Sequence, residues 1–456
     1  MAQIDVLAGR PIGTVDRRIF GSVAEHLGRC VNGGVLDQGS PGELRADVLA
    51  AVRDLGVTNV RWPLRAGPGQ ESGRFGTGEF ITWCAAAGVE PVLALDMGTG
   101  TLDEALAWVE YCNGSDSYWA GRRRASGYAE PFGVRYWGLG REMYRRHTAA
   151  EYVTEARHWA SALRRLDPGI RLISCGQTGM DDWDRIVIDG LARHVDFHSI
   201  HLYTGSADYW SNVLAPHYAE RALSVAGALI DRARYVQRIE HEISVAFDEW
   251  NVWYRTDDAR LEERYNLADA LAVATYLNVF VRQCWTVRMA NLAQLVNVIA
   301  PIVTSAEGMF TQSIYHPFRL MAAASEQVAV DTYTDSGTHA HRDRPADRWP
   351  YRVADLGLFQ LLDVAATADT ERRRLTVSVV NRDPDRAIQT RIRLHDARAA
   401  GMMTVHEVTG EGLDAVNTFA RPDAVSAHSA KREVNGEDVD VTFAPRSFTL
   451  LEMELA

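Results

Sequence analysis

Between residues 16 and 320, short apolar or β-branched runs alternate with longer segments of helical periodicity. Strands that alternate with helices in this way are typical of parallel βαβ units. Eight runs qualify as strands, at residues 18–23, 58–62, 90–96, 134–139, 171–175, 195–203, 243–250 and 289–296. Eight such units fit a closed (β/α)8 barrel, or TIM barrel, better than a doubly wound open sheet. We therefore predict a catalytic barrel over residues 16–320.

The helical segments have the expected internal pattern. In the segment 149–167, Tyr152, Ala156, Trp159 and Leu163 recur at helical spacing. Pro168 and Gly169 follow and end the helix, because proline cannot continue it and glycine favours a turn.

After about residue 320 the helical pattern stops and strand-like runs follow, such as QVAVDTYT, LTVSVVN, QTRIRL, VDVTFAP and FTLLEMEL. We predict a β-sandwich domain over residues 321–456, to which residues 1–15 could also belong. The polar segment 336–350 is expected to be an exposed loop.

Composition narrows the function classes. The net charge is -12 and the pI is about 5.6, so polyphosphate partners such as nucleic acids are disfavoured. No apolar stretch approaches the roughly 18 residues of a membrane helix, and no secretory signal is visible, so we expect a cytoplasmic protein without a membrane partner. The five cysteines are odd in number and lack a CxxC pair, which favours buried free thiols over disulfides or a metal site.

Two glutamates end predicted strands. Glu142 closes VRYWGLGRE on the fourth strand, and Glu249 closes ISVAFDE on the seventh. Barrel active sites form at the carboxyl ends of the strands, and retaining glycoside hydrolysis needs two carboxyl groups about 5 Å apart. A single glutamate at such a position is more often a surface residue or an ion-pair partner. The aromatic and apolar surroundings of both, however, make an unused charge costly.

Five strings in this sequence resemble the family 51 glycoside hydrolases, whose usual activity is α-L-arabinofuranosidase. They are FGSVAEHLGRCVNGGV (20–35), YWGLGREM (136–143), DFHSIHLY (196–203), FDEWNVWY (247–254) and ANLAQLVNVIAPI (290–302). By this resemblance Glu142 is the general acid/base and Glu249 is the nucleophile. No metal or cofactor is implied, because two carboxyl groups suffice for the reaction.

The resemblance also implies a set of sugar-binding residues. Glu25 and Gln294 match ligands of the sugar hydroxyl groups, His201 and Tyr203 match residues that orient the nucleophile and contact the glycone, and Trp253 would line the pocket. Taken singly, His201 and Trp253 would more often be core residues. Their order within matching strings favours the functional interpretation.

Two features depart from the family pattern. Arg141 stands where the family has an asparagine that binds the sugar 2-hydroxyl, and an arginine cannot accept a hydrogen bond. We expect Arg141 either to pair with a carboxylate such as Glu25 or Asp96, or to bind an altered glycone. The segment 61–76, which normally supplies another asparagine, is also shortened.

Several functions therefore stay open. The leading prediction is a retaining exo-hydrolase that releases terminal α-L-arabinofuranosyl residues from an arabinose-containing oligosaccharide or glycoside. An alternative keeps both glutamates but changes the glycone, as in a galactofuranosidase, xylosidase or endoglucanase. Another is a catalytically impaired carbohydrate-binding homologue. The resemblance also implies a homo-oligomer, often a hexamer.

Overall fold

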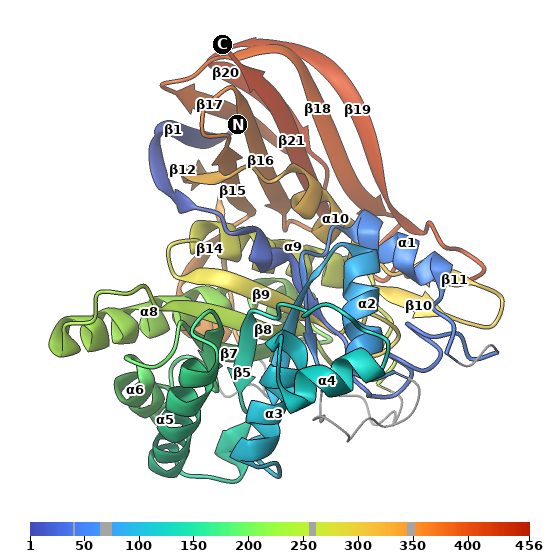
Figure 1. Cartoon of the computed structure of the whole chain (residues 1–456). Helices are drawn as coiled ribbons and strands as arrows, with labels where there is room; N and C mark the ends of the chain where they lie inside the picture. Colours follow the sequence, from blue (N-terminus) through green and yellow to red (C-terminus); the bar gives the residue numbers. More distant parts are fainter. Residues whose placement is uncertain (40–41, 64–74, 255–260, 344–351) are drawn as a thin grey trace.

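The computed structural model describes residues 1–39, 42–63, 75–254, 261–343 and 352–456. Eight parallel strands close into a barrel in chain order (Figure 1). They are β2 (Gly21–Val23), β3 (Asn59–Trp62), β4 (Glu90–Leu95), β5 (Tyr136–Leu139), β6 (Arg171–Ser174), β7 (Phe197–Thr204), β8 (Ser244–Val252) and β9 (Val287–Ala293). β2 pairs with both β3 and β9, which closes the ring and confirms the predicted (β/α)8 barrel.

Helices surround the barrel and connect its strands (Figure 1). They are α1 (Ala46–Leu55), α2 (Thr77–Ala87), α3 (Leu102–Asn113), α4 (Tyr118–Ala125), α5 (Ala149–Leu166), α6 (Asp182–Leu191), α7 (Tyr209–Leu214), α8 (His217–Gln237), α9 (Leu267–Arg282) and α10 (Tyr315–Ala324). The predicted helix at 149–167 is α5, which begins with a capping box between Thr148 and Glu151.

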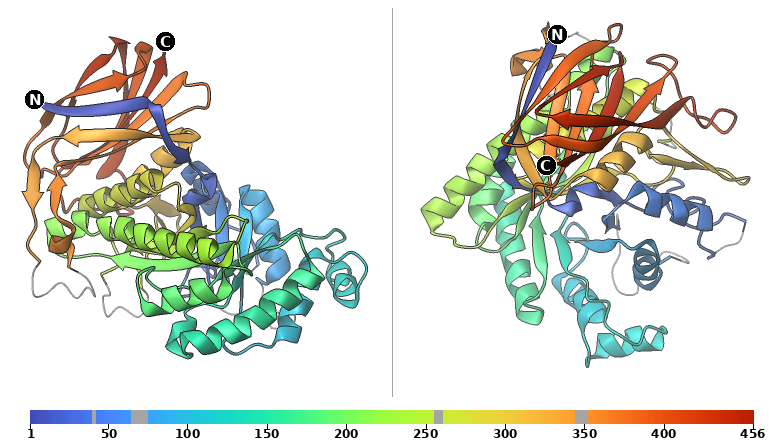
Figure 2. Two further views of the ribbon diagram at one scale, coloured as in Figure 1. Left: turned by 90° about the vertical axis from the view of Figure 1, so that its left-hand side faces the viewer. Right: turned by 90° about the horizontal axis from the view of Figure 1, so that it is seen from above.

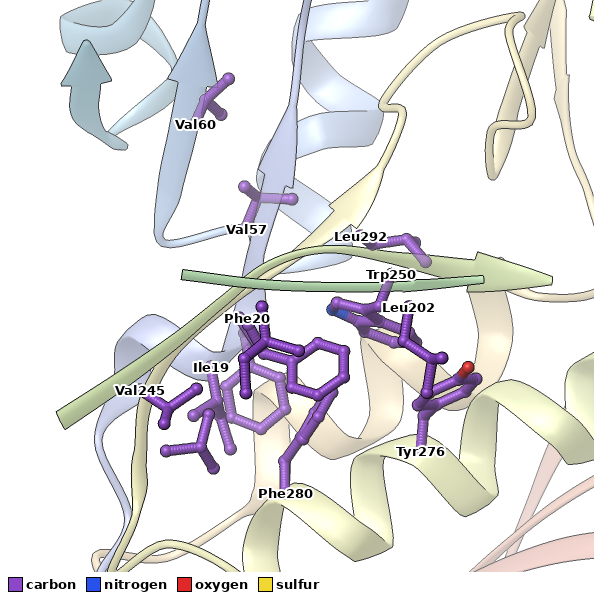
Figure 3. Packing of buried hydrophobic residues seen from close by; sticks show 14 of the residues in the cluster. Ile19, Phe20, Val57, Val60, Leu202, Val245, Trp250, Tyr276, Phe280 and Leu292 are labelled. Carbon is purple, nitrogen blue, oxygen red and sulfur yellow. The ribbon is translucent and has the colours of Figure 1, made fainter. Parts of the chain in front are cut away.

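Apolar side chains pack inside the barrel and also between its wall and the surrounding helices. One small cluster takes a residue from each of six strands: Val92, Tyr136, Ile173, Phe197, Ala246 and Met289. Outside the wall, Trp250 of β8 packs on Tyr276 and Phe280 of α9, with ring centroids 5.0 and 5.1 Å away (Figure 3). Such layers are expected of a barrel whose interior is a packed core.

Strand β8 contains one extra residue near its carboxyl end. A three-residue step on β8, from Ala246 to Glu249, lies opposite the two-residue step from Ser199 to His201 on β7, and the pairing of β8 with β9 shifts at the same place. A regular strand would send Asp248 and Glu249 to opposite faces. The bulge lets both carboxylates contact barrel-mouth residues, as described below.

The C-terminal region is built of strands, as predicted. A continuous nine-stranded sheet has the order β19-β18-β21-β16-β15-β12-β1-β17-β20. Figure 2 shows its orange and red strands together with the blue N-terminal strand. Its members are β1 (Ala2–Thr14), β12 (Val328–Asp335), β15 (Leu362–Ala368), β16 (Arg374–Asn381), β17 (Ile388–His395), β18 (Ala399–Gly410), β19 (Val425–Gly436), β20 (Asp438–Phe443) and β21 (Ser447–Leu455). The edge strands β19 and β20 contact each other, so the sheet curls around a second apolar core.

Several local features differ from the sequence-based expectations. Residues 18–20 of the first predicted strand belong to a 3-10 helix (Arg17–Phe20), and only Gly21–Val23 is a strand. Within the expected loop at 336–350, β13 (Thr338–Ala340) pairs with β14 (Leu358–Gln360), while residues 344–350 lie outside the described ones. A further small pair joins β10 (Ile302–Thr304) and β11 (Met309–Thr311).

The apolar character of the helices and the state of the cysteines complete the description of the fold. Among the described residues, no helix has the length and apolar character needed to cross a bilayer. All five cysteines are free and buried, as the sequence led us to expect.

Candidate active site

The predicted site residues gather at the carboxyl ends of the barrel strands. Glu25 follows β2, Arg141 and Glu142 follow β5, His201 and Tyr203 lie in β7, Glu249 lies in β8, Trp253 follows β8 and Gln294 follows β9. Their convergence is a product of barrel closure, since these residues span most of the first 300 positions.

Glu249 is the centre of the cluster, and its side chain is only 3% exposed. Arg141 Nε donates a hydrogen bond to its Oε1 at 2.7 Å, and the Arg61 guanidinium contacts the same oxygen. Tyr203 donates its hydroxyl hydrogen to Oε2 at 2.9 Å, and His201 Nδ1 lies 3.4 Å from that oxygen. Both carboxylate oxygens are therefore held in fixed positions.

These partners determine the charge of Glu249. Burial alone would raise the pKa of this carboxyl group, but His201, Arg141 and Arg61 outweigh the burial and hold its pKa well below the usual range. Glu249 is consequently an ionised carboxylate at neutral pH, as an attacking nucleophile must be.

Glu25 forms a second buried carboxylate beside Glu249. Gln294 Nε2 donates a hydrogen bond to its Oε2 at 2.8 Å. Its Oε1 accepts from Arg61 Nη2 at 3.4 Å and lies 3.8 Å from Arg141 Nε. The expected pairing of Arg141 with Glu25 is present, although the contact with Glu249 is shorter.

Two members of this cluster were missed by the sequence analysis. Arg61 Nη1 donates to Asp248 Oδ2 at 3.0 Å, and Ser199 donates its hydroxyl hydrogen to Oδ1 of the same carboxylate. Burial opposes ionisation of Asp248, but Arg61 and His201 lower its pKa to about 2. A charged residue inside the apolar strand TNVRW, and an acid directly before Glu249, were the available signals.

Glu142 has a different environment from Glu249. Its backbone is left-handed, with φ of 47°, after Gly140 at φ of 79°, so the chain turns sharply at the end of β5. A left-handed conformation is uncommon for glutamate and is found at functional sites. Its Oε1 accepts from Arg145 Nη2 at 2.8 Å and from the Tyr144 hydroxyl at 3.2 Å, and its side chain is 22% exposed.

Asp96 does not pair with Arg141, contrary to one of the two pairings expected from the sequence. Its carboxylate instead accepts hydrogen bonds from the backbone N–H groups of Gly98 and Thr99, both at 3.0 Å, and from the Thr99 hydroxyl. These short-range bonds fold the loop after β4 and satisfy the Asp96 oxygens locally.

Trp253 lies against the cluster. Its ring packs edge-on to Tyr203, with the centroids 5.3 Å apart. Within the altered segment 61–76, residues 64–74 lie outside the described ones.

Comparisons with known proteins agree with the barrel fold. The family models described as "Alpha-L-arabinofuranosidase 1 domain" and "Alpha-L-arabinofuranosidase C-terminal domain" match residues 53–218 and 248–447. The chain is 38% identical to a probable α-L-arabinofuranosidase C of Aspergillus clavatus, over 91% of this chain and 90% of that one. It is 37% identical to the α-L-arabinofuranosidase C of Emericella nidulans, over 98% and 96%.

Solved α-L-arabinofuranosidase structures are similar to this chain over nearly its full length. A crystal structure of the Thermotoga maritima α-L-arabinofuranosidase in complex with arabinose has a TM-score of 0.87 and 33% identity, and covers 100% of both chains. The GH51 α-L-arabinofuranosidase of Thermotoga petrophila has a TM-score of 0.89 and 33% identity, over 99% of this chain and 100% of that one.

Proposed function

Because the chain belongs to the family 51 glycoside hydrolases, the α-L-arabinofuranosidase family, we propose that it releases terminal α-L-arabinofuranosyl residues from oligosaccharides or glycosides with retention of anomeric configuration. The single observation that carries the proposal is the contrast between two carboxyl groups. Glu249 is buried, ionised and held at both oxygens, whereas Glu142 is partly exposed beside a cavity. Retaining hydrolysis needs one carboxylate to attack and another carboxyl group to deliver a proton.

The reaction proceeds in two steps. A Glu249 oxygen attacks the anomeric carbon as the glycosidic bond breaks, and Glu142 gives its proton to the leaving oxygen. Glu142 then removes a proton from water, which attacks the anomeric carbon and releases Glu249 and the free sugar. Tyr203, His201 and Arg61 keep Glu249 in place, which lowers the cost of reaching the reactive geometry.

The remaining predicted residues surround the glycone. Glu25 and Gln294 offer a carboxylate and an amide to the sugar hydroxyl groups, and their own hydrogen bond fixes their positions. Trp253 supplies an apolar surface against the C–H face of the sugar.

Arg141 supports an alternative choice of glycone. It is a donor-only side chain and reaches the nucleophile, at 2.7 Å from Glu249. An asparagine there could accept a hydrogen bond from the sugar 2-hydroxyl, and Arg141 cannot. A galactofuranoside, a xyloside or a glucan is therefore our second candidate substrate.

The discriminating experiment is a panel of 4-nitrophenyl glycosides. We expect the highest kcat/KM on the α-L-arabinofuranoside, and anomeric analysis by NMR should show a retained product at early times. A higher value on the galactofuranoside, xyloside or glucoside would favour the altered glycone. Absence of turnover on all four, with sugar binding in calorimetry, would instead identify a catalytically impaired carbohydrate-binding homologue.

Location and assembly complete the proposal. A Bacillus subtilis relative, 29% identical over 97% of both chains, is named an intracellular exo-α-(1→5)-L-arabinofuranosidase, and we propose the same compartment and exo action here. We also propose that the chain forms a homo-oligomer, with a hexamer as the expected assembly, which sedimentation velocity of the purified chain would test.

A further inference from the structure

A cavity of about 330 Å³ lies directly beside Glu142. One wall is the loop after β4, with Asp96 and Thr99, and the other is the segment that follows β5 and carries Arg141, Arg145 and Arg146. In a retaining hydrolase the leaving group lies on the side of the general acid. The cavity is therefore positioned to receive the aglycone.

The charges around this cavity are unevenly satisfied. The Asp96 carboxylate accepts hydrogen bonds from the backbone and a hydroxyl group of its own loop, and Arg141 binds Glu249. Among the residues that the structure describes, Arg145 pairs only with Glu142 and its neighbour Tyr144. Arg146 is exposed and has no ion pair with any residue in the described part of the chain. The cavity thus offers one arginine without an acidic partner and one whose partner is the proton donor.

We propose that this cavity binds a carboxylate carried by the leaving group, so that the preferred substrates have an acidic aglycone such as a uronic acid or an aromatic acid. This inference rests on the proposed hydrolase function and adds the chemical class of the aglycone. Arginine is suited to this task because its planar guanidinium matches the geometry of a carboxylate.

The same contact assists proton transfer. When Glu142 carries the proton that it will donate, it no longer offers Arg145 a full negative charge. A carboxylate on the aglycone gives Arg145 and Arg146 a replacement partner at that moment. The interaction is then present in the transition state and absent from the free enzyme and free substrate, so it increases kcat/KM.

The overall charge of the chain makes this local feature distinctive. The net charge is -12, so the molecule as a whole repels anions. A local excess of arginine beside the general acid counteracts that repulsion at this place. Because both arginines are solvent-exposed, the benefit will decrease with ionic strength.

The test compares 3-carboxyphenyl and 3-carbamoylphenyl α-L-arabinofuranosides, which have similar shape and differ in charge. We expect kcat/KM to be about fivefold higher for the carboxylate at low salt, the size typical of one exposed charge contact, and the ratio to approach one in high salt. Arg146→Ala should abolish most of the preference, measured as the ratio of kcat/KM for the two substrates within the same variant. The matched control Arg165→Ala, an exposed arginine at the end of α5, should keep the full preference.

Each outcome has a defined meaning. Hydrolysis of both substrates at equal rates, or an undiminished preference in Arg146→Ala, would overturn the carboxylate subsite and leave the hydrolase proposal intact. Hydrolysis of neither substrate would overturn the proposed arabinofuranosidase function, and the subsite with it.

Discussion

The molecule contains two buried clusters of arginine and carboxylate with almost the same composition. The mouth cluster consists of Glu25, Arg61, Arg141, Asp248 and Glu249. The junction cluster consists of His217, Glu220, Arg282, Asp363 and Arg382, where α8 and α9 meet the C-terminal sheet. In both, arginines hold buried carboxyl groups such as Glu249 and Asp363 at lowered pKa.

Judged by cavity size alone, the junction cluster would be the better candidate for an active site. It borders a cavity of about 620 Å³, against about 330 Å³ beside Glu142. Its charges are balanced, however, because Arg282 lies 3.0 Å from Glu220 and 2.9 Å from Asp363, and Arg382 lies 3.2 Å from Asp363. We interpret it as a connection between the barrel and the sheet.

The mouth cluster, by contrast, has more carboxylates than arginines. Three carboxylates, Glu25, Asp248 and Glu249, face two arginines, Arg61 and Arg141. The surplus acceptors suit hydroxyl donors of a sugar. Burial and perturbed pKa values therefore do not distinguish an active site from a structural ion network. The active site is instead distinguished by its position at the strand ends and by its surplus of hydrogen-bond acceptors.

The largest expected effect in the mouth cluster is at Glu249, the proposed nucleophile. We expect Glu249→Gln to reduce kcat/KM on the order of 10⁴-fold or more, because the amide cannot form the glycosyl–enzyme bond. Labelling with a cyclophellitol-type furanoside, followed by peptide mass spectrometry, should modify Glu249 in the wild type. The exposed Glu240→Gln is a matched control that should keep full activity. A label on another residue would refute the assignment.

Glu142→Ala should have the next largest effect, and it should depend on the leaving group. We expect a loss of about 10²- to 10⁴-fold on alkyl or sugar aglycones, which need protonation, and a much smaller loss on 4-nitrophenyl substrates. Added azide should restore turnover and give a glycosyl azide with the configuration of the substrate. Equal losses on both types of substrate would contradict the acid/base role.

The junction cluster should respond in stability and not in catalysis. Asp363→Asn leaves Arg282 and Arg382 without their shared carboxylate, and we expect it to lower the free energy of unfolding by about 3–5 kcal/mol. Urea unfolding measures this, and kcat/KM of the folded enzyme should not change. Asp182→Asn, whose side chain is 88% exposed, should leave both quantities unaltered. Loss of activity without loss of stability would make the junction a functional site.

The smallest expected effect concerns pH. Arg141→Asn removes a cation that lowers the pKa of Glu249, so that pKa rises. Glu249 must be ionised to attack, and the acid limb of kcat/KM against pH should therefore move to higher pH. Arg61 and His201 remain and limit the shift. An unchanged acid limb would show that Arg141 does not control the charge of the nucleophile.

By itself, the sequence determined the architecture and the two catalytic candidates. The alternation of strand and helix patterns indicated eight βα units, and these units place Glu142 and Glu249 at the same end of the barrel. This was possible because periodicity and strand ends are local properties of the chain. Strand β1 was only an uncertain addition, since its partners β12 and β17 are more than 300 residues away in the sequence.

Only the tertiary structure decided the contacts inside the site. The bulge in β8, which lets Asp248 and Glu249 both contact the mouth cluster, depends on pairing with β7 and β9. Arg141 binds Glu249 most closely, although Glu25 and Asp96 were also candidate partners. Asp96 already accepts hydrogen bonds from its own loop, and Glu25 already accepts one from Gln294. Such competition among polar groups is resolved by distances across the folded chain, which no local pattern records.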